Sequence, residues 1–486
     1  MSGLILPAVG SLAVLALVVT ADPSVPNAPP PSPISSPGAR STLDMVAIPG
    51  PDSARVRQLF AGLAAADPLV CELAVDQLRN NWNWRRGSTG IGSIQEVSAA
   101  TRAALDSIGN RVTDPHAVPL LVANLGSTSP CLRRAAAVML GESQLPGARS
   151  ALRTAYQSPS ANVREAAALG LGRGEDTVSI AALTAGLKDG DAAVAAMSAW
   201  ALGDIESPRA VPALVAALGA GNVRLRMTAV WALGQIEDTA ATKPLVARLK
   251  DQDPQVRVLA AEALGEIEDT AATSGLVAVL GSDDTALRLA AVEALGQIED
   301  PASTMAVAKL LTDRDAEIRV AAANALGQIE DPRSVPALVK ALGDDNPRLR
   351  EAAAEALGQI EDARAAGPLA NLLTDPEPRV QLAAIEALGQ LDDVHQAPPQ
   401  LVAALKNPNP KIRIHAAEAL GQIEDPGTVA ALGAAMKDPD LKVRIAAAEG
   451  LSRIDSEAVT PYFIAAMKDA NPEMRRVAAE ALGDRR

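Results

Sequence analysis

Apolar side chains recur along most of the chain at a spacing typical of paired helices. In the stretch from 327 to 358, the first half carries them at i, i+3, i+4 and i+7, as Val335, Leu338, Val339 and Leu342. This spacing predicts a first helix with a single apolar stripe. The polar turn at 343–345 interrupts it, and a second helix is predicted from about Pro347 to Leu357. Gly358 stands at the predicted end of that helix, where a residue without a Cβ reverses the chain easily.

The same pattern returns every 31 residues. Each repeat contains one small residue, usually after Ala-Leu, which we call the repeat position: Gly141, Gly172, Gly203, Gly234, Gly265, Gly296, Gly327, Gly358, Gly389 and, after one extra residue, Gly421, Ser452 and Gly483. These 12 repeats span 111–486, and such a period predicts an all-α fold, an α-solenoid (superhelix) of helix–turn–helix repeats. A solenoid offers a long surface, which favours recognition over catalysis.

Helix-capping residues precede each second helix. Twelve residues before the repeat position stand Ser129, Ser160, Asp191, Asn222, Asp253, Asp284, Asp315, Asn346, Glu377, Asn409, Asp440 and Asn471. All except Glu377 are favourable N-caps, and Pro follows several of them at the first helical position. Asp-Pro pairs such as Asp331-Pro332 likewise predict the starts of first helices.

Two charged ladders run in step with the repeat. Arginines stand eight residues before the repeat position, including Arg226, Arg257, Arg288, Arg319 and Arg350. Aspartates follow four residues after it, including Asp238, Asp269, Asp300, Asp331 and Asp362. We expect Arg–Asp pairs between neighbouring repeats that fix their stacking. An anion-binding rail of arginines is the alternative.

The combined pattern D-P-x-x-V-P-A-L-x-x-A-L…V-R-x-A-A-A-x-A-L-G-x-I-x-D resembles HEAT repeats, specifically the short type named for phycobilisome lyases. The resemblance covers about 375 residues. It implies a right-handed solenoid whose second helices line the concave face and which serves as a scaffold for other proteins. Enzymes with similar repeats include bilin lyases, deoxyhypusine hydroxylase and DNA glycosylases, but their site residues have no counterparts here.

Positions that differ between repeats are candidates for partner binding. Three residues before the repeat position, early repeats carry Val138, Leu169, Trp200 and Trp231, whereas later ones carry acids, among them Glu262, Glu293, Glu355, Glu386 and Glu418. An aliphatic row, with Met227 beside the tryptophans, precedes them by four residues on the same helical face. We expect exposed tryptophans to anchor a protein or peptide partner with apolar and basic segments. Space-filling tryptophans and solvated glutamates are the alternative.

The first 110 residues lack the period. Residues 1–21 are predicted to be a signal peptide or membrane anchor, because 4–20 are mostly apolar and Val19-Thr20-Ala21 is typical of a cleavage site. Residues 22–52 are a Pro/Ser-rich linker, and 53–110 an irregular helical N-terminal cap before the array at 111–486. Within the cap, the loop around Trp82 and Trp84 either closes the array or binds a ligand.

Composition and charge argue against several classes of function. The net charge of −14 disfavours nucleic acid as a partner. The sequence has no His/Cys cluster with metal-ligand spacing and no nucleophile with an identifiable base, so no cofactor, metal or catalytic residue is predicted. Cys71 and Cys131 are expected to remain unbonded, because two repeats at roughly 8–10 Å per helix layer would separate them.

The function predicted from these features is a non-enzymatic, exported (periplasmic or extracellular) scaffold that binds a polypeptide. An alternative is the extracytoplasmic sensor part of a membrane signalling protein, such as a sensor metallopeptidase, with 4–20 as its membrane tether. A bilin-lyase-like enzyme is a more distant alternative.

Overall fold

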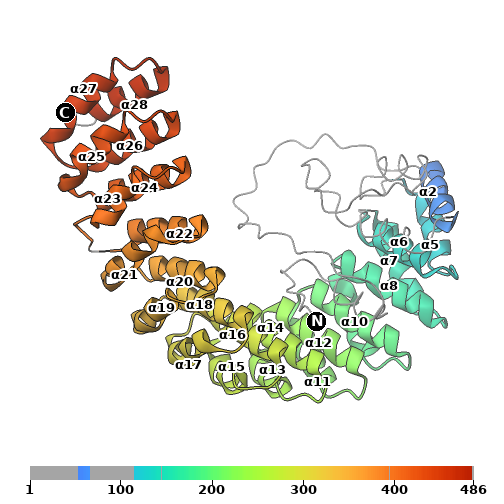
Figure 1. The fold of residues 1–486 in the computed structure, drawn as a ribbon. Coiled ribbons are helices and arrows are strands. Elements are labelled where there is room, and N and C mark those ends of the chain that lie inside the picture. Colours follow the sequence, from blue (N-terminus) through green and yellow to red (C-terminus); the bar gives the residue numbers. More distant parts are fainter. Residues whose placement is uncertain (1–52, 66–113, 144, 393, 484–486) are drawn as a thin grey trace. The chain divides into compact units, whose positions relative to one another are not determined.

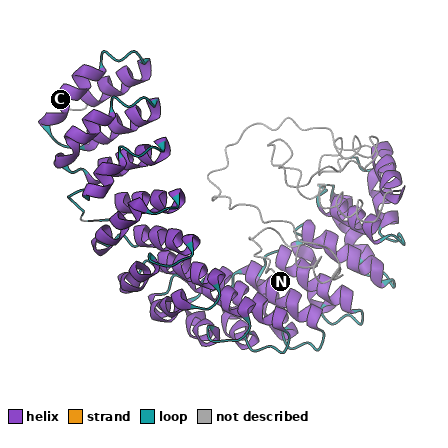
Figure 2. Ribbon diagram, in the orientation of Figure 1, coloured by secondary structure: helices purple, strands orange, loops and turns teal. Residues whose placement is uncertain are grey.

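A computed structural model describes residues 53–65, 114–143, 145–392 and 394–483. Every regular element in these residues is a helix, and no strand occurs among them (Figures 1 and 2). The chain divides into two compact units, Met1–Ala263 and Leu264–Arg486, with the division inside α14 (Pro254–Ile267). The predicted all-α solenoid is confirmed.

The N-terminal unit alternates first and second helices after α2 (Ser53–Ala65). Its first helices are α5 (Ala117–Asn124), α7 (Pro146–Ala155), α9 (Ile180–Gly186), α11 (Val211–Ala217) and α13 (Thr242–Arg248), and short 3-10 turns η1 (Thr177–Ser179), η2 (Pro208–Ala210) and η3 (Thr239–Ala241) lead into the last three. Its second helices are α6 (Pro130–Gly141), α8 (Ala161–Arg173), α10 (Ala192–Asp204) and α12 (Val223–Ile236).

The C-terminal unit continues the alternation. Its first helices are α15 (Thr273–Val279), α17 (Thr304–Lys309), α19 (Val335–Ala341), α21 (Ala366–Asn371), α23 (Pro399–Ala404), α25 (Val429–Ala435) and α27 (Thr460–Ala466). Its second helices are α16 (Thr285–Ile298), α18 (Ala316–Ile329), α20 (Pro347–Gln359), α22 (Pro378–Gln390), α24 (Pro410–Ile423), α26 (Leu441–Arg453) and α28 (Pro472–Gly483). The 3-10 turns are η4 (Thr270–Ala272), η5 (Pro301–Ser303), η6 (Leu310–Thr312), η7 (Pro332–Ser334), η8 (Ala363–Ala365), η9 (Leu372–Thr374), η10 (Pro426–Thr428) and η11 (Glu457–Val459).

Packing follows the repeat within each unit. Consecutive second helices pack on one another, as α8, α10 and α12 do, and each described first helix outside the unit boundary packs on the second helix of its own repeat. Alanine and leucine supply the contact surface of the second helices; in α20, Leu349, Ala353 and Leu357 are buried. Small alanines let the helix axes approach closely, which explains the low aromatic content.

Helix starts match the predicted caps. Ten of the eleven predicted N-cap side chains accept a hydrogen bond from a backbone N–H in the first turn, as Asn346 does from Arg348 at 3.0 Å. Ser160 makes no such bond, and Glu377, the expected exception, makes none either. Asp331 caps η7, so the Asp-Pro signal for the starts of first helices is also confirmed.

The repeat glycine has a different role from the predicted one. Gly327 does not end its helix, because α18 continues to Ile329. A Cβ built on Gly327 would lie 3.0 Å from Cα of Ala356 on the next second helix and 2.1 Å from Oε1 of Gln359. Glycine is therefore required by the close approach of neighbouring second helices rather than by chain reversal.

Glutamate occupies the left-handed position that reverses the chain. The residue three after the repeat glycine has positive φ in eight repeats: Glu175, Glu206, Glu237, Glu268, Glu299, Glu330, Glu361 and Glu424. All eight side chains are exposed. This conformation costs a residue with a Cβ about 1–2 kcal/mol, so each of these turns carries local strain.

The arginine ladder does pair between repeats, but not with the predicted aspartates. Arg350 donates from Nε and Nη2 to Asp375 of the next repeat at 2.8 and 2.9 Å, and from Nη1 to the carbonyl oxygen of Asp344 at 2.9 Å. Equivalent ion pairs join Arg164–Asp189, Arg226–Asp251, Arg288–Asp313, Arg319–Asp344, Arg413–Asp438 and Arg444–Asp469. Arg257 binds the carbonyl oxygen of Asp251. The arginine lies in the first turn of the second helix, which places it beside the interhelix turn of the next repeat.

The predicted aspartates cap the 3-10 turns instead. Asp238, Asp269, Asp300, Asp331 and Asp362 each accept a hydrogen bond from the backbone N–H two residues later. Two of them also reach the preceding repeat, where Asp300 accepts from Thr273 and Asp331 from Thr304, both at 2.7 Å. The two ladders therefore both stabilise stacking, through separate partners.

Cys131, on α6, forms a disulfide bond. The expectation that the cysteines remain unbonded is wrong, because it extended the regular layer spacing into a region where the period does not hold. Cys71, like residues 1–52 and the Trp82/Trp84 loop, lies outside the described residues. Among the described helices, none combines the length and apolarity needed to cross a bilayer.

Candidate functional site

The second helices of the C-terminal unit turn one side to solvent. In α20 this side consists of Arg348, Glu351, Glu355 and Gln359, of which only Glu351 is half-buried and the others are exposed. Steps of three and four residues put these side chains on one face of the helix. The corresponding positions in each repeat stand ten, seven and three residues before the repeat position and one residue after it. We call them the second-helix face.

An acidic row occupies one line of this face. It consists of Glu293, Glu355, Glu386, Glu418, Glu449 and Glu480, with Asn324 at the same position in α18. Burial raises the pKa of Glu293. Although the Glu355 side chain is exposed, partial desolvation of its carboxylate by the surrounding helices, together with the negative charges of Glu351 and Glu386, raises its pKa. The carboxylates of Glu293 and Glu355 are incompletely solvated, so a cation placed beside either of them would be stabilised there. Glu262, the corresponding residue of α14 in the N-terminal unit, is exposed.

Basic side chains contact acidic groups of this face in several repeats, among them the following two. Arg379 Nε lies 3.3 Å from Glu351 Oε2. His415 Nδ1 lies 3.1 Å from Glu418 Oε2 and 3.5 Å from Glu386 Oε1. His415 therefore bridges two members of the acidic row on neighbouring helices.

A basic row runs along the edge of the same face. Four consecutive repeats carry an exposed cation ten residues before the repeat position: Arg348, Arg379, Lys411 and Lys442. Sequence reasoning missed this row, although its 31- and 32-residue spacing was readable in the same register as the acids. Arg348 pairs with Glu317 of the preceding second helix at 2.5 Å.

Aliphatic side chains lie between the two charged rows. Leu289, Val320, Leu382, Ile414 and Ile445 are all half-buried at the position seven residues before the repeat position. The second-helix face of the C-terminal unit thus combines an apolar strip with a charged row on either side. Such a surface suits an amphipathic segment of polypeptide.

The tryptophans in the N-terminal unit are not exposed, which corrects the expectation. Trp200 is 0% exposed and Trp231 is 8% exposed. Met227, Leu169 and Val138 are 6%, 2% and 2% exposed. None of these five side chains presents an exposed surface for a partner to bind.

Two contacts explain part of this burial. The rings of Trp200 and Trp231 stack with their centroids 6.2 Å apart and their planes 8° apart, and the Arg173 guanidinium lies 5.3 Å from the centre of Trp200. Each indole also lies over the repeat glycine of the preceding repeat, since a Cβ on Gly172 or Gly203 would come within 2.9 Å of the ring. In the C-terminal unit, a Cβ on the repeat glycine would instead meet a glutamine Oε1 of the next repeat at 2.0–2.4 Å, at Gly296, Gly327, Gly358 and Gly389.

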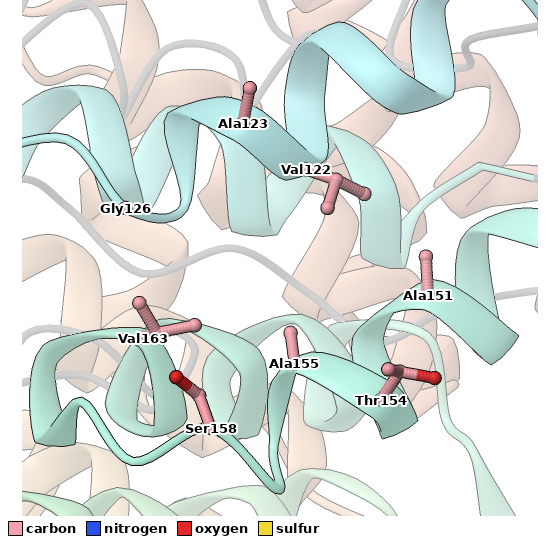
Figure 3. A pocket seen from close by; sticks show the side chains of 8 residues that line it. All are labelled: Val122, Ala123, Gly126, Ala151, Thr154, Ala155, Ser158 and Val163. Atoms are coloured by element: carbon pink, nitrogen blue, oxygen red, sulfur yellow. The ribbon is translucent and has the colours of Figure 1, made fainter.

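A shallow apolar pocket of about 410 Å³ lies beside first helices α5 and α7 (Figure 3). Thr154 and Ser158 supply its polar side chains, while Val122, Ala151 and Val163 contribute apolar surface. The described residues contain no group of three or more His, Cys, Asp or Glu side chains able to hold a metal ion. The pocket offers van der Waals contacts and two hydroxyl groups.

Solved structures share the fold. Importin beta matches with a TM-score of 0.59 and 16% identity over 88% of this chain and 69% of that chain. Kap95p in its complex with RanGDP matches with a TM-score of 0.50 and 16% identity over 89% and 66%. The CpcE–CpcF phycocyanin lyase complex of Nostoc sp. PCC7120 is 28% identical over 46% and 90%, with a TM-score of 0.30. A comparison with curated proteins found no match.

The family model described as HEAT repeats matches nearly the whole array. Its matches cover residues 98–172, 180–253, 242–314, 304–389, 336–403 and 397–483. They include all the second helices described above, and their repeat register agrees with the observed helix pairs. The chain belongs to the HEAT-repeat family.

Proposed function

We propose that this protein is a non-enzymatic scaffold that binds a polypeptide along the second-helix face of its C-terminal unit. The observation that carries the proposal is the acidic row that runs beside an aliphatic strip of half-buried side chains. A partner with an apolar stripe flanked by Lys or Arg would cover the strip and neutralise the row.

The known neighbours support a protein partner in general terms. Kap95p is described in complexes with RanGDP and with Nup1. Such complexes illustrate that a stack of HEAT repeats can hold another protein. The net charge of −14 favours a basic partner over a nucleic acid.

Binding of synthetic 20-residue helical peptides, followed by fluorescence anisotropy, tests the proposal. One peptide has a leucine stripe flanked by lysines, and its matched control replaces each Lys with Glu. We expect the Lys peptide to bind more tightly, with an affinity that falls as salt is raised.

Two variants with the same change in net charge then locate the site. Glu355→Gln, Glu386→Gln and Glu418→Gln together remove charge from the acidic row, whereas Glu330→Gln, Glu361→Gln and Glu424→Gln remove it from the interrepeat turns. We expect at least a tenfold loss of Lys-peptide affinity in the first triple variant and less than a twofold change in the second. Equal losses in both would refute the proposed site.

We further propose that the protein is exported, with residues 1–21 as a signal peptide or anchor. The disulfide of Cys131 supports this proposal, because disulfides persist in oxidising compartments and are rare in reducing ones. Mass spectrometry of the protein purified from its host gives both the mature N-terminus and the cysteine oxidation state. A retained Met1 together with reduced cysteines would contradict export.

A further inference from the structure

The second-helix face of the C-terminal unit carries opposite charges along its two sides. Over the four helices α20, α22, α24 and α26, the basic row consists of Arg348, Arg379, Lys411 and Lys442, and the acidic row of Glu355, Glu386, Glu418 and Glu449. In each of these helices the acid stands seven residues after the base. The aliphatic strip lies between the two rows, with Glu351 at its position in α20. The face is therefore polarised across its width.

The width of this face matches one helix. Seven residues of α-helix rise about 10.5 Å, so the two rows are about that far apart along each second helix. An α-helix with its side chains is about 10–12 Å across. A helix laid across the stack, on the aliphatic strip, has one edge over the acidic row and the other edge over the basic row. Neighbouring extended strands are spaced only about 4.8 Å apart, so one strand spans less than half of this width.

The length of the face sets the length of its occupant. Helices α20, α22, α24 and α26 pack on one another in that order. At roughly 8–10 Å per helix spacing, their three intervals span about 24–30 Å. A helix that rises about 1.5 Å per residue covers this distance with about 16–20 residues. One helix of about five turns therefore contacts both rows on all four second helices.

Contacts within the face show that the basic row attracts carboxylates. Arg348 Nη1 lies 2.5 Å from Glu317 Oε1, and Arg379 Nε lies 3.3 Å from Glu351 Oε2. In both pairs the acid comes from the preceding second helix, α18 or α20. A carboxylate from a partner can approach the rest of the row in the same way.

Both rows retain charged groups for such a partner. Lys411 and Lys442 of the basic row are exposed, and neither forms an ion pair with another described residue. The same holds for Glu355 and Glu449 of the acidic row. These four side chains lie on both sides of the aliphatic strip, so a partner with charges of one sign would meet like charges along one of its edges.

We propose that the partner segment is a single amphipathic helix with a basic edge and an acidic edge, which lies across α20, α22, α24 and α26. Its apolar stripe covers the aliphatic strip, its basic edge faces the acidic row, and its acidic edge faces the basic row. This inference rests on the proposed function, and it adds to that partner a helical conformation and a second charged edge.

Two synthetic 20-residue helical peptides of identical composition test the arrangement of charges. The polarised peptide carries Lys along one edge of a leucine stripe and Glu along the other edge. The mixed peptide carries the same residues, with Lys and Glu alternating along both edges, so its net charge is the same. In fluorescence anisotropy we expect the polarised peptide to bind at least fivefold more tightly. Equal affinities would overturn the inference.

Two double variants of the full chain locate the acidic edge. Lys411→Gln with Lys442→Gln removes two charges from the basic row, whereas Lys406→Gln with Lys437→Gln removes two from the turns after α23 and α25. We expect at least a threefold loss of affinity for the polarised peptide in the first variant and less than a 1.5-fold change in the second. Equal losses in the two variants would contradict the proposed position of the acidic edge.

A third peptide tests the helical conformation. It is the polarised peptide with two central residues replaced by Pro, which prevents a continuous helix. We expect its affinity to fall at least tenfold. A Pro peptide that binds as tightly as its parent would show that the occupant is extended, and would overturn the inference.

The peptide with Lys on both edges separates this inference from the proposed function. If its binding depends on the acidic row while the polarised and mixed peptides bind equally, the inference fails and the proposed function stands. If the triple Gln variant of the acidic row binds every peptide as the wild type does, the proposed function fails and the inference fails with it.

Discussion

Arg350 of one repeat donates two hydrogen bonds, of 2.8 and 2.9 Å, to the carboxylate of Asp375 in the next repeat. Burial alone would raise the pKa of Asp375, but the hydrogen bond from Arg350, that from the Glu377 N–H and the charge of Arg350 together lower it. The carboxylate thus stays ionised at the joint between repeats. This ion pair therefore joins neighbouring repeats, and its arginine is not free to bind an external anion.

Replacing Asp375 with Asn is expected to reduce the free energy of unfolding by about 2 kcal/mol, because it removes a charge-assisted pair and leaves Arg350 partly buried without its counter-charge. Urea denaturation followed by circular dichroism measures the loss. Asp345→Asn is the matched control, since Arg350 contacts only the backbone carbonyl of Asp345. Equal midpoints for the two variants would contradict this role for the pair.

Gly327→Ala is expected to cost about 1–3 kcal/mol, because its Cβ would collide with Ala356 and with the Gln359 side chain on the next helix. Gly343→Ala is the control, since a Cβ there would meet only the Lys340 carbonyl oxygen at 3.6 Å. Adding Gln359→Ala to Gly327→Ala should recover part of the loss in thermal denaturation. A Gly327→Ala protein as stable as the control would show that close approach does not require the glycine.

Glu330→Gly is expected to stabilise the protein by about 0.5 kcal/mol. The gain from relieving a left-handed residue, about 1–2 kcal/mol, exceeds the entropic cost of glycine, about 0.5–1 kcal/mol. Glu449→Gly makes the same change inside α26 and should destabilise by about 1 kcal/mol. Paired chemical denaturation curves distinguish them, and a loss of stability in both variants would argue against strain at Glu330.

Acid should weaken the joint at Asp331 between pH 4 and 2. A hydrogen bond from Arg333 lowers the pKa of this carboxyl from 3.8 to about 2, against the effect of burial and with help from Thr304 and the Arg333 N–H. The folded state therefore binds fewer protons than the unfolded state. The stabilisation is fully present above about pH 5 and is lost as pH falls through the folded pKa.

Denaturation midpoints of the wild type and of Asp331→Asn, measured from pH 7 down to pH 2, test this dependence. The variant should be less stable at pH 7, and the gap should close toward pH 2. A gap that stays constant with pH would mean that the charge of Asp331 contributes nothing.

Much of the fold could be predicted from the sequence, because a repeat multiplies each local signal. The caps at Asp191 and Asn346 and the apolar stripe of Val335 and Leu338 act within one helix, so their spacing is sufficient. The partner of Arg350 is different, since Asp362 and Asp375 both recur with the period. Only the geometry of the stacked helices decides between them.

The errors at the candidate site have a similar physical origin. Trp200 and Glu355 share a position in the repeat, so the sequence gives no sign that one is covered and the other open. The left-handed turn is occupied by Glu330 although glycine is favoured there, which hid the true end of α18. The Cys131 disulfide depends on a segment without the period, where spacing arguments do not apply.

The central claim is that a polypeptide partner lies along the second-helix face of the C-terminal unit. Cross-linking in the native host, followed by capture of this protein and mass spectrometry, tests it most directly. The account predicts that partner cross-links fall on α18, α20, α22 and α24, next to Glu355, Glu386 and Glu418, and that they disappear in the triple Gln variant. Partner cross-links confined to the first helices α17, α19, α21 and α23, and unaffected by that variant, would contradict it.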